Sequence, residues 1–241
     1  HPNRDRARVT PADITSDLYD SLARLRTDCI DLYLFHRDDP AVPVEPLVKV
    51  MNEHIEAGRI RAYGGSNWRH RRIEEAQQYA STHGLVPMAA SSPHFSLAVQ
   101  VEPPWQGCVG LTEPGGEDAL RWYEHTGLPV FAYSSLARGF FRGRITRENF
   151  DEKKDQLDIP CRRAYCHEVN FQRLERAREL AEEKGVSVPQ LVLAYSLNQS
   201  LNIFPLTGAR TPEEIKANVA ACDLALETRE LEWLELKRST R

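Results

Sequence analysis

The sequence predicts an α/β fold in which parallel strands alternate with helices. Apolar strand segments and amphipathic helical segments follow one another at a spacing of roughly 30 residues, which favours parallel pairing through right-handed crossovers. Polar or glycine-rich clusters follow five of the predicted strands, at the edge where such folds place ligand sites. The strands could form an open doubly wound sheet or a barrel. With 241 residues, the chain is long enough for one sizeable core, and we expect a single domain over residues 1–241.

The first third of the chain contributes three predicted pairs of a helix and a strand. Thr10 and Pro11 provide a cap and a first-turn residue, after which apolar residues recur at helical spacing to about Arg26. The apolar run at 29–35 predicts the first strand. The other elements expected here are helices at 45–57 and 69–82 and strands at 60–63 and 86–90.

The rest of the chain continues the alternation around one long connection. This connection, residues 134–165, mixes basic residues with a charged run, and loops of such length are usually disordered or gate a site. Thr211, with Glu214 three residues later, marks the start of a helix that runs to about Cys222. The other expected elements are helices at 117–126, 170–184, 188–199 and 228–237 and strands at 129–133 and 202–206.

Composition and charge argue against several classes of partner. The chain is 41% hydrophobic and 27% charged with a formal net charge of −4, so no positive excess favours nucleic acid or an anionic membrane surface. The amino end, residues 1–6, is polar and lacks the apolar core of a signal peptide, and no long apolar run predicts a membrane span. We therefore expect a soluble, cytoplasmic protein.

The cysteines predict neither a disulfide framework nor a metal site. They are odd in number and scattered, which favours reduced thiols: Cys29, Cys108, Cys161, Cys166 and Cys222. Cys161 and Cys166 cluster with His167, but their spacing matches no standard zinc pattern. We expect no metal.

Two clusters near the predicted strand ends have both a structural and a functional interpretation. His36 follows a short apolar strand, where a titratable side chain is either simply hydrogen-bonded or part of a site. The stretch 64–67, Gly-Gly-Ser-Asn, could be a tight turn with glycine at positive φ and a polar helix cap. Alternatively, its polar side chains could pair with both the oxygen and the nitrogen of a ligand amide.

Three further features are equally open. Tyr133 ends an apolar strand, where its ring either plugs the core or supports a planar cofactor. Arg210 stands beside a helix start and either binds a phosphate or is solvated at the cap. Trp105, in the loop 96–116, either walls a pocket or lies on an exposed loop. No glycine-rich dinucleotide fingerprint is present, so a nucleotide would not bind in the Rossmann manner.

Taken in order, these motifs resemble the aldo/keto reductase superfamily. The residues that carry the resemblance are His36, 65–67, 133–139, 208–210 and Asn218. The match covers nearly the whole chain, with 28–39 similar to the family's fourth barrel strand. The resemblance implies a (β/α)8 TIM-type barrel of which about five of the eight strands are present.

The resemblance also implies a cofactor and a reaction. We expect NADP(H) and the reduction of a small-molecule carbonyl compound, an aldehyde, ketone or sugar, to an alcohol by hydride transfer, with His36 orienting the carbonyl oxygen. The residues assigned to the cofactor are Ser66, Asn67 and Ser92 at the carboxamide, Tyr133 on the ring, Ser134, Leu136 and Arg138 at the pyrophosphate, Gly208 and Arg210 at the 2′-phosphate, and Glu214 and Asn218 at the adenine. Ser92 replaces a glutamine common in the family and Glu214 replaces a glutamine or arginine, so the choice between NADP and NAD stays open.

The family's catalytic aspartate, tyrosine and lysine come from its first three strands, whereas the resemblance begins just before the fourth. We therefore expect a truncated chain, the rear portion of a longer reductase, whose partner is an amino-terminal segment or a second copy. Tyr33 does not replace the missing acid, because alternation along a strand directs it away from the face of His36 and toward the helices. Little or no turnover is expected from this chain alone. The alternatives are a non-catalytic nucleotide-binding or regulatory subunit, or a gene product without a stable fold.

Overall fold

The computed structural model describes residues 8–241. The polar amino end, residues 1–6, on which the expectation about a signal peptide rests, lies outside the described residues. The described residues form two compact units, one of residues 8–92 with Leu128–Val130 and one of Pro93–Gly127 with Phe131–Arg241. Within this described part, no helix combines the length and the apolar character needed to cross a membrane.

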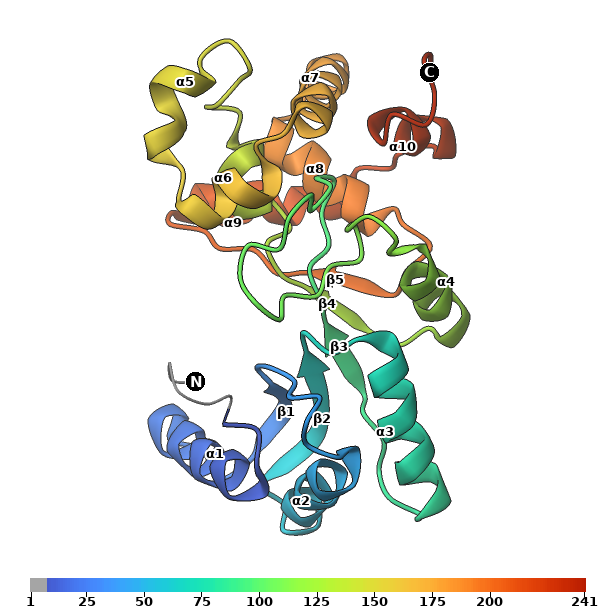
Figure 1. Ribbon diagram of the computed structural model, residues 1–241. Helices are drawn as coiled ribbons and strands as arrows, with labels where there is room; N and C mark the ends of the chain where they lie inside the picture. The colour runs from blue at the N-terminus through green and yellow to red at the C-terminus, as the bar shows by residue number, and fades with distance from the viewer. Residues whose placement is uncertain (1–7) are drawn as a thin grey trace. The chain divides into compact units, whose positions relative to one another are not determined.

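The first unit contains three helices beside the first strands (Figure 1). Its elements are α1 (Pro11–Leu25), β1 (Ile30–Phe35), α2 (Val44–Glu56), β2 (Ile60–Ser66), α3 (His70–Thr82) and β3 (Ala90–Ser92). The predicted cap is confirmed, because the Thr10 side chain accepts a hydrogen bond from the backbone N–H of Asp13. Tyr33 is directed toward the helices as expected, since the hydroxyl of Ser21 on α1 lies within hydrogen-bonding reach of it.

The core of the first unit is aromatic next to the end of β1. Phe35 stacks on the fully buried Trp68 at 5.3 Å and meets Tyr63 edge-on at 6.3 Å. Such pairs stabilise by about 0.5–1.5 kcal/mol beyond the area that they bury. The end of β1 is therefore anchored in the core, and the residues that follow it leave from a fixed point.

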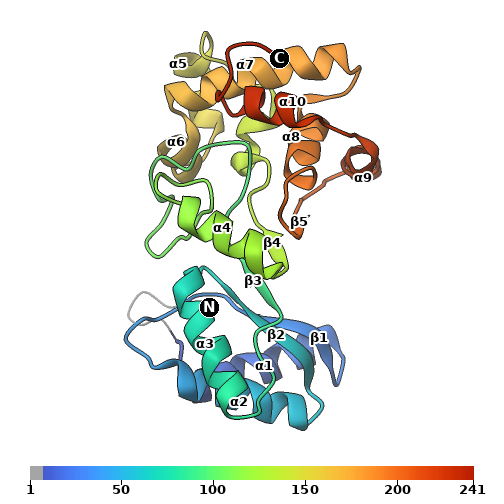
Figure 2. The same ribbon diagram turned by 90° about the vertical axis from the view of Figure 1, so that its right-hand side faces the viewer.

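The second unit is mainly helical, with α7 packed against α8 and α10 (Figure 2). The elements after β3 are α4 (Glu117–Thr126), β4 (Val130–Ala132), α5 (Phe150–Lys153), α6 (Ile159–Tyr165), α7 (Glu168–Glu183), α8 (Val188–Leu197), β5 (Ile203–Pro205), α9 (Pro212–Ala220) and α10 (Thr228–Leu234), with 3-10 turns at Ala137–Arg142, Lys154–Gln156 and Ala221–Asp223. A capping box between Ser187 and Gln190 starts α8. Residues 191–196 of α8 are all buried, which makes this helix the centre of the unit's core.

Hydrogen bonding orders the strands β1-β2-β3-β4-β5. The register of the parallel pairs brings Phe35 opposite Gly65 and Ser66 opposite Ser92. The predicted α/β class with parallel strands is confirmed. Strands β1 and β5 are the two ends of this order.

Two strand predictions were wrong in their limits. The predicted strand 86–90 is instead β3 at Ala90–Ser92, because Val86 is bound by side chains: its N–H and C=O pair with the Asn52 amide at 2.7 and 3.1 Å. Strand β2 extends three residues past the predicted end, through both glycines. A Cβ on Gly64 would lie 2.2 Å from the backbone oxygen of Ala90, so glycine allows the two strands to approach closely.

The connection 134–165 is not irregular throughout. It contains α5, α6 and two of the 3-10 turns. Asp158 caps α6 by accepting a hydrogen bond from the Cys161 N–H at 2.7 Å, and Pro160 stands in the first turn. An aspartate two residues before a proline is a helix-start signal, so this helix could have been predicted.

Candidate functional site

His36 lies at the surface directly after β1. The loop that follows it is held by Arg72, whose Nε lies 3.2 Å from the Asp38 carboxylate and whose Nη2 donates to the carbonyls of Asp39 and Val42. Partial burial of the imidazole and the positive charge of Arg37 lower the pKa of His36. A lowered pKa favours the neutral imidazole, which can donate one N–H to a carbonyl oxygen.

Ser66, Asn67 and Ser92 meet at the ends of β2 and β3. The Ser66 hydroxyl donates to the carbonyl of Ser92 at 2.8 Å, and the Asn67 amide donates to Ser66 Oγ at 3.1 Å and to the carbonyl of His36 at 3.3 Å. All three residues are buried. The structure thus brings together four predicted site residues of the first unit, with hydroxyl and amide groups that can serve as donors and acceptors for a ligand amide.

The turn-and-cap interpretation of residues 64–67 was wrong. Neither Gly64 nor Gly65 has positive φ; the left-handed residue is Asn67 at φ 60°. Helix α3 begins after Arg69, and no side chain caps it. Ser66 and Asn67 therefore have no capping role that would account for them.

In the second unit, predicted site residues lie at Tyr133 and in the loop after β4. Ser134, Ala137 and Arg138 all have left-handed φ, between 47° and 54°. Such conformations cost on the order of 1–3 kcal/mol each in non-glycine residues and cluster at functional sites. Hydrogen bonds hold the loop in this shape, from Ala137 N–H to the Ser134 carbonyl at 2.7 Å and from Ser135 Oγ to the Ala132 carbonyl at 2.9 Å. Leu136 lies within this loop, partly buried.

Arg138 is exposed and paired with Asp158. Its Nε lies 3.0 and 3.2 Å from the two carboxylate oxygens, and its Nη2 also donates to Asp158. These hydrogen bonds lower the pKa of Asp158. Because Asp158 also caps α6, the ion pair fixes the loop after β4 to the start of that helix.

Arg210 and Glu214 lie at the start of α9. Thr211 caps the helix as predicted, accepting from the Glu214 N–H at 3.2 Å, and the Glu214 carboxylate accepts from the Arg210 N–H at 2.7 Å. This last bond, with the positive charges of Arg210, Arg142 and Arg144, lowers the pKa of Glu214. Three arginines thus act on one helix start, where backbone N–H groups also favour anions.

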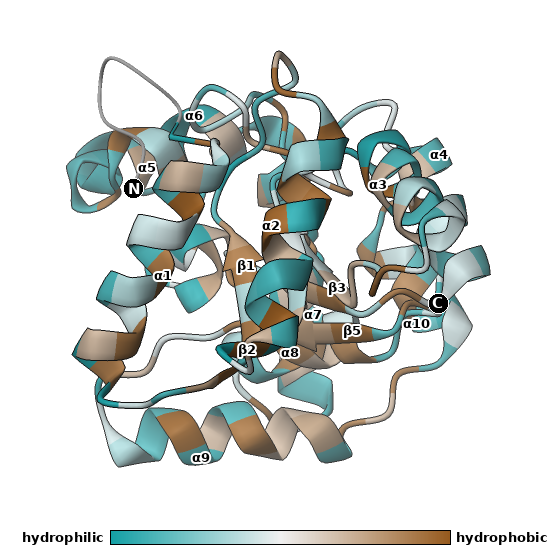
Figure 3. Ribbon diagram, turned by 90° about the horizontal axis from the view of Figure 1, so that it is seen from below, coloured by the Kyte–Doolittle hydropathy of each residue, from teal (hydrophilic) through white to brown (hydrophobic). Residues whose placement is uncertain are grey.

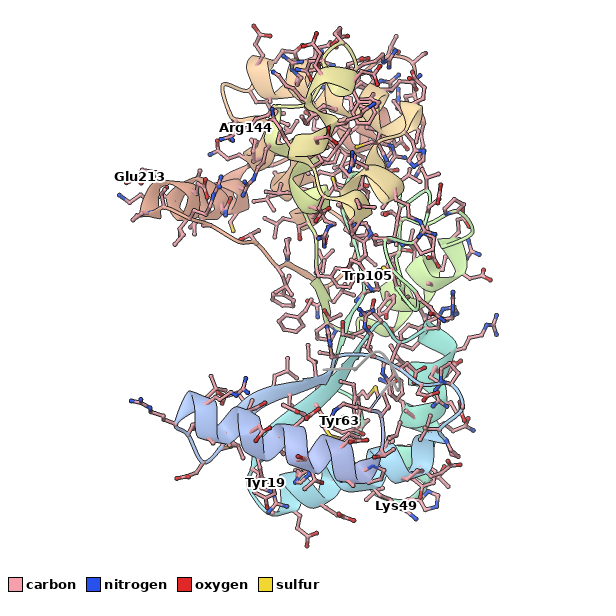
Figure 4. All side chains as sticks on the ribbon, turned by 60° about the vertical axis from the view of Figure 1, so that its left-hand side comes forward. Tyr19, Lys49, Tyr63, Trp105, Arg144 and Glu213 are labelled. Atoms are coloured by element: carbon pink, nitrogen blue, oxygen red, sulfur yellow. The ribbon has the colours of Figure 1, made fainter. Side chains whose placement is uncertain are left out.

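Sequence reasoning missed Arg142 and Arg144. In Figure 4, Arg144 extends from the ribbon toward the side on which α9 carries Glu213. The available signal was the run 138–144, which contains three arginines and two glycines within the long connection. Arg142 and Arg144 therefore add positive charge near the start of α9.

Asn218 lines an open cleft of about 370 Å³ beside α8 and α9. The cleft is otherwise mainly apolar, lined by Leu193, Leu197, Pro205, Thr207, Ala209, Ile215, Val219 and Cys222. The hydrophobic bands on α9 are visible in Figure 3. A Cβ on Gly208, near the mouth of this region, would meet no atom within 4 Å, so packing inside the chain does not require glycine there. The cleft can take a flat, mostly apolar group with a polar edge.

The cysteines are free thiols. Cys161 is buried and directs its Sγ toward the Ala137 carbonyl at 3.5 Å. Within residues 8–241, no three His, Cys, Asp or Glu side chains are grouped so that they could hold a metal ion.

Comparison with known proteins gives consistent matches. The family model described as Aldo/keto reductase family matches residues 2–237. The aldo-keto reductase YhdN of Bacillus subtilis (strain 168) is 30% identical over 224 residues, which are 90% of this chain and 58% of that protein. The chain therefore spans less than two thirds of the length of this curated relative.

Solved structures match in fold. The aldo-keto reductase from Klebsiella pneumoniae in complex with NADPH has a TM-score of 0.68 and 24% identity, covering 97% of this chain and 67% of that one. The thermostable aldo-keto reductase Tm1743 in complex with the inhibitor epalrestat also has a TM-score of 0.68, at 22% identity, covering 95% of this chain and 67% of that one. These matches confirm the predicted fold class, that of the (β/α)8 barrel.

Proposed function

The chain belongs to the aldo/keto reductase family, and on that basis we propose that it binds NADP(H) and serves hydride transfer to the carbonyl carbon of an aldehyde, ketone or sugar. The observation that carries the proposal is the hydrogen-bonded set of His36, Ser66, Asn67 and Ser92. The proposal includes a single domain over residues 1–241, as the sequence analysis expects.

The nicotinamide end of the cofactor is assigned to the strand ends. A carboxamide presents one acceptor and two donors, and the hydroxyl and amide groups of Ser66, Asn67 and Ser92 are of the type that complements both. The ring is proposed to stack on Tyr133, which contributes about 0.5–1.5 kcal/mol and fixes one face of the ring. When bound, NADPH supplies the hydride.

The phosphates are assigned to the loop after β4 and to the start of α9. Ser134, Leu136 and Arg138 are proposed to line the pyrophosphate. Gly208 and Arg210 are proposed to meet the 2′-phosphate. The positive charges of Arg142 and Arg144 act on the Glu214 carboxylate, as that of Arg210 does. This excess of positive charge favours the phosphorylated cofactor, NADP(H), over NAD(H).

The adenine is assigned to the cleft beside α9. Asn218 and Glu214 are proposed to face it, with the apolar walls of the cleft on the faces of the ring. Gly208 lies between two residues that line the cleft, Thr207 and Ala209, and a Cβ added to it would meet no protein atom within 4 Å.

His36 is proposed to orient the carbonyl oxygen of the substrate. Its lowered pKa keeps the imidazole neutral, so that it donates a hydrogen bond rather than a charge. The proton that completes the alcohol requires an acid, and Tyr33 is directed toward α1 and so is not that acid. This observation favours a second candidate, a non-catalytic NADP(H)-binding or regulatory subunit.

Partners are proposed at the outer edge of β5. This end strand exposes Phe204 by 47%, and the adjoining Leu206 by 46%. An unpaired strand edge with apolar side chains pairs readily with another strand. An amino-terminal segment of a reductase chain or a second copy of this chain is the proposed partner.

Two measurements test the function. Calorimetric titration should show NADPH binding tighter than NADH binding; failure to bind either would refute the proposal. Carbonyl-dependent oxidation of NADPH then separates the two candidates, because binding without turnover supports the non-catalytic subunit. Where turnover is present, His36→Ala should lower it and leave NADPH affinity within about twofold, since the imidazole is assigned to the substrate.

A further inference from the structure

A short turn of the second unit lies against Tyr133. The Trp105 ring lies 5.9 Å from the Tyr133 ring at an interplanar angle of 31°. Three residues later, Cys108 Sγ lies 3.0 Å from the Tyr133 hydroxyl, which also donates to the Val109 carbonyl at 3.3 Å. The Cys108 N–H donates to the Trp105 carbonyl at 3.3 Å and closes the turn. One turn therefore contacts both the ring and the hydroxyl of the same tyrosine.

Trp105 also contacts the arginine that follows Tyr133 in the chain. The Arg138 guanidinium lies 5.7 Å from the centre of the Trp105 ring, within the range of a cation–π contact. The Asp158 carboxylate also binds that guanidinium, accepting from Nε at 3.0 and 3.2 Å. Trp105, labelled in Figure 4, thus lies between the side chains proposed for the nicotinamide ring and for the pyrophosphate.

The remaining surroundings of Tyr133 limit its movement further. The ring of His94, which has no exposed surface, lies 5.9 Å from the Tyr133 ring. Tyr133 itself is half-buried. The Tyr133 side chain has two rotatable bonds. Rotation about both is restricted by contacts with the Trp105 ring, the Cys108 thiol, the Val109 carbonyl and the His94 imidazole.

We propose that Trp105 is a positioning residue for Tyr133, fixing the plane of its ring so that the nicotinamide can stack on it. The inference rests on the proposed function, in which Tyr133 carries the nicotinamide. Stacking energy depends on the angle and offset of the two rings, so a tyrosine that rotates freely would lose part of it. Trp105 acts through Tyr133 and makes no contact with the cofactor.

The first test is Trp105→Ala in the 241-residue chain, with affinities measured by calorimetry. NADPH binding should weaken about three- to tenfold, the size of one aromatic pair. Binding of 2′,5′-ADP, which has no nicotinamide, should stay within about twofold. Trp105→Phe keeps a ring and should recover most of the loss. Trp122→Ala is the matched control, because Trp122 is in the same unit and packs edge-on against Tyr123 instead.

The second test is a double-mutant cycle with Tyr133→Ala. If Trp105 acts through Tyr133, adding Trp105→Ala to Tyr133→Ala should weaken NADPH binding by less than about twofold more. Additive losses would overturn the inference, because Trp105 would then act on its own. Equal weakening of 2′,5′-ADP by Trp105→Ala would also overturn it, by showing a general structural role. Absence of NADPH binding by the unsubstituted chain would refute the proposed function itself, and is distinguishable from both.

Discussion

The residues assigned to the nicotinamide and those assigned to the phosphates are held by different means. In the first unit, Ser66, Asn67 and Ser92 are buried, and the register of paired strands fixes them. In the second, Ser134 and Arg138 lie in a loop set by local hydrogen bonds and one ion pair. A close-packed sheet is sensitive to small changes in volume, whereas a loop depends on individual polar contacts. The two regions should therefore fail in different ways.

The largest effect is expected from Gly64→Ala in the first unit. The new methyl group would lie 2.2 Å from the Ala90 carbonyl oxygen and 2.8 Å from Leu34 Cδ2, and the backbone atom cannot move without separating β2 from β3. The free energy of unfolding should fall by about 3 kcal/mol, measured by urea denaturation. Gly208→Ala in the second unit is the control and should change it little, because nothing lies within 4 Å. Similar losses in both variants would contradict the comparison.

The buried imidazole of His94 tests whether the core of the second unit is packed as tightly as the strands of the first unit. Burial lowers the pKa of His94 to about 3, in contact with the rings of Tyr133 and Tyr165. The unfolded chain, with a histidine pKa of about 6.5, binds this proton first. Stability should therefore fall as the pH drops from about 6.5 toward 3, by about 1.4 kcal/mol per pH unit from this group.

Unfolding free energies of His94→Gln and of the unsubstituted chain, measured between pH 7 and pH 4.5, check this expectation. The variant should lose most of the slope that His94 contributes, whatever its stability at pH 7. An unchanged slope would mean that His94 becomes protonated without unfolding, so that the core around Tyr133 admits water.

The next effect is expected at Arg210, on the loop side of the comparison. Arg210→Ala should weaken NADPH binding about tenfold and NADH binding by less than twofold, because only NADPH carries the 2′-phosphate. Calorimetry at two salt concentrations measures both, and the difference should shrink at high salt, since the site is exposed. Lys216→Ala removes a positive charge from α9, which follows Arg210, and serves as the control. Equal weakening of NADPH binding and NADH binding would contradict the assignment of Arg210 to the 2′-phosphate.

The same contrast explains which parts were predictable. The ends of parallel strands share one edge, so His36, Ser66 and Asn67 could be placed near one another from their positions after apolar runs. The caps at Thr10 and Thr211 are local and were readable. Strand β3 was misplaced because a side chain, Asn52, binds Val86, and no pattern of apolar residues reports that contact.

The loop side was less predictable because its contacts are distant in the sequence. Trp105 contacts Tyr133, 28 residues later in the chain, and Arg138 pairs with Asp158, 20 residues later. Arg142 and Arg144 act on Glu214 although about 70 residues separate them. Such pairings follow from tertiary packing. The composition of the connection therefore predicted that it is charged, but not which residues its charged side chains contact.

The smallest effect is expected at Asn67, where side chain and backbone can be separated. Asn67→Gly removes the amide but accepts the φ of 60°, whereas Asn67→Ala removes the amide and adds strain of about 1 kcal/mol. Both variants should bind NADPH and NADH about threefold more weakly and bind 2′,5′-ADP as before, because the amide is assigned to the carboxamide. Both variants should also lose stability in urea, because both remove the buried hydrogen bonds of the amide to Ser66 Oγ and to the His36 carbonyl. If Asn67→Gly retains full affinity for NADPH, the amide serves to join the ends of β1 and β2 and does not contact the cofactor.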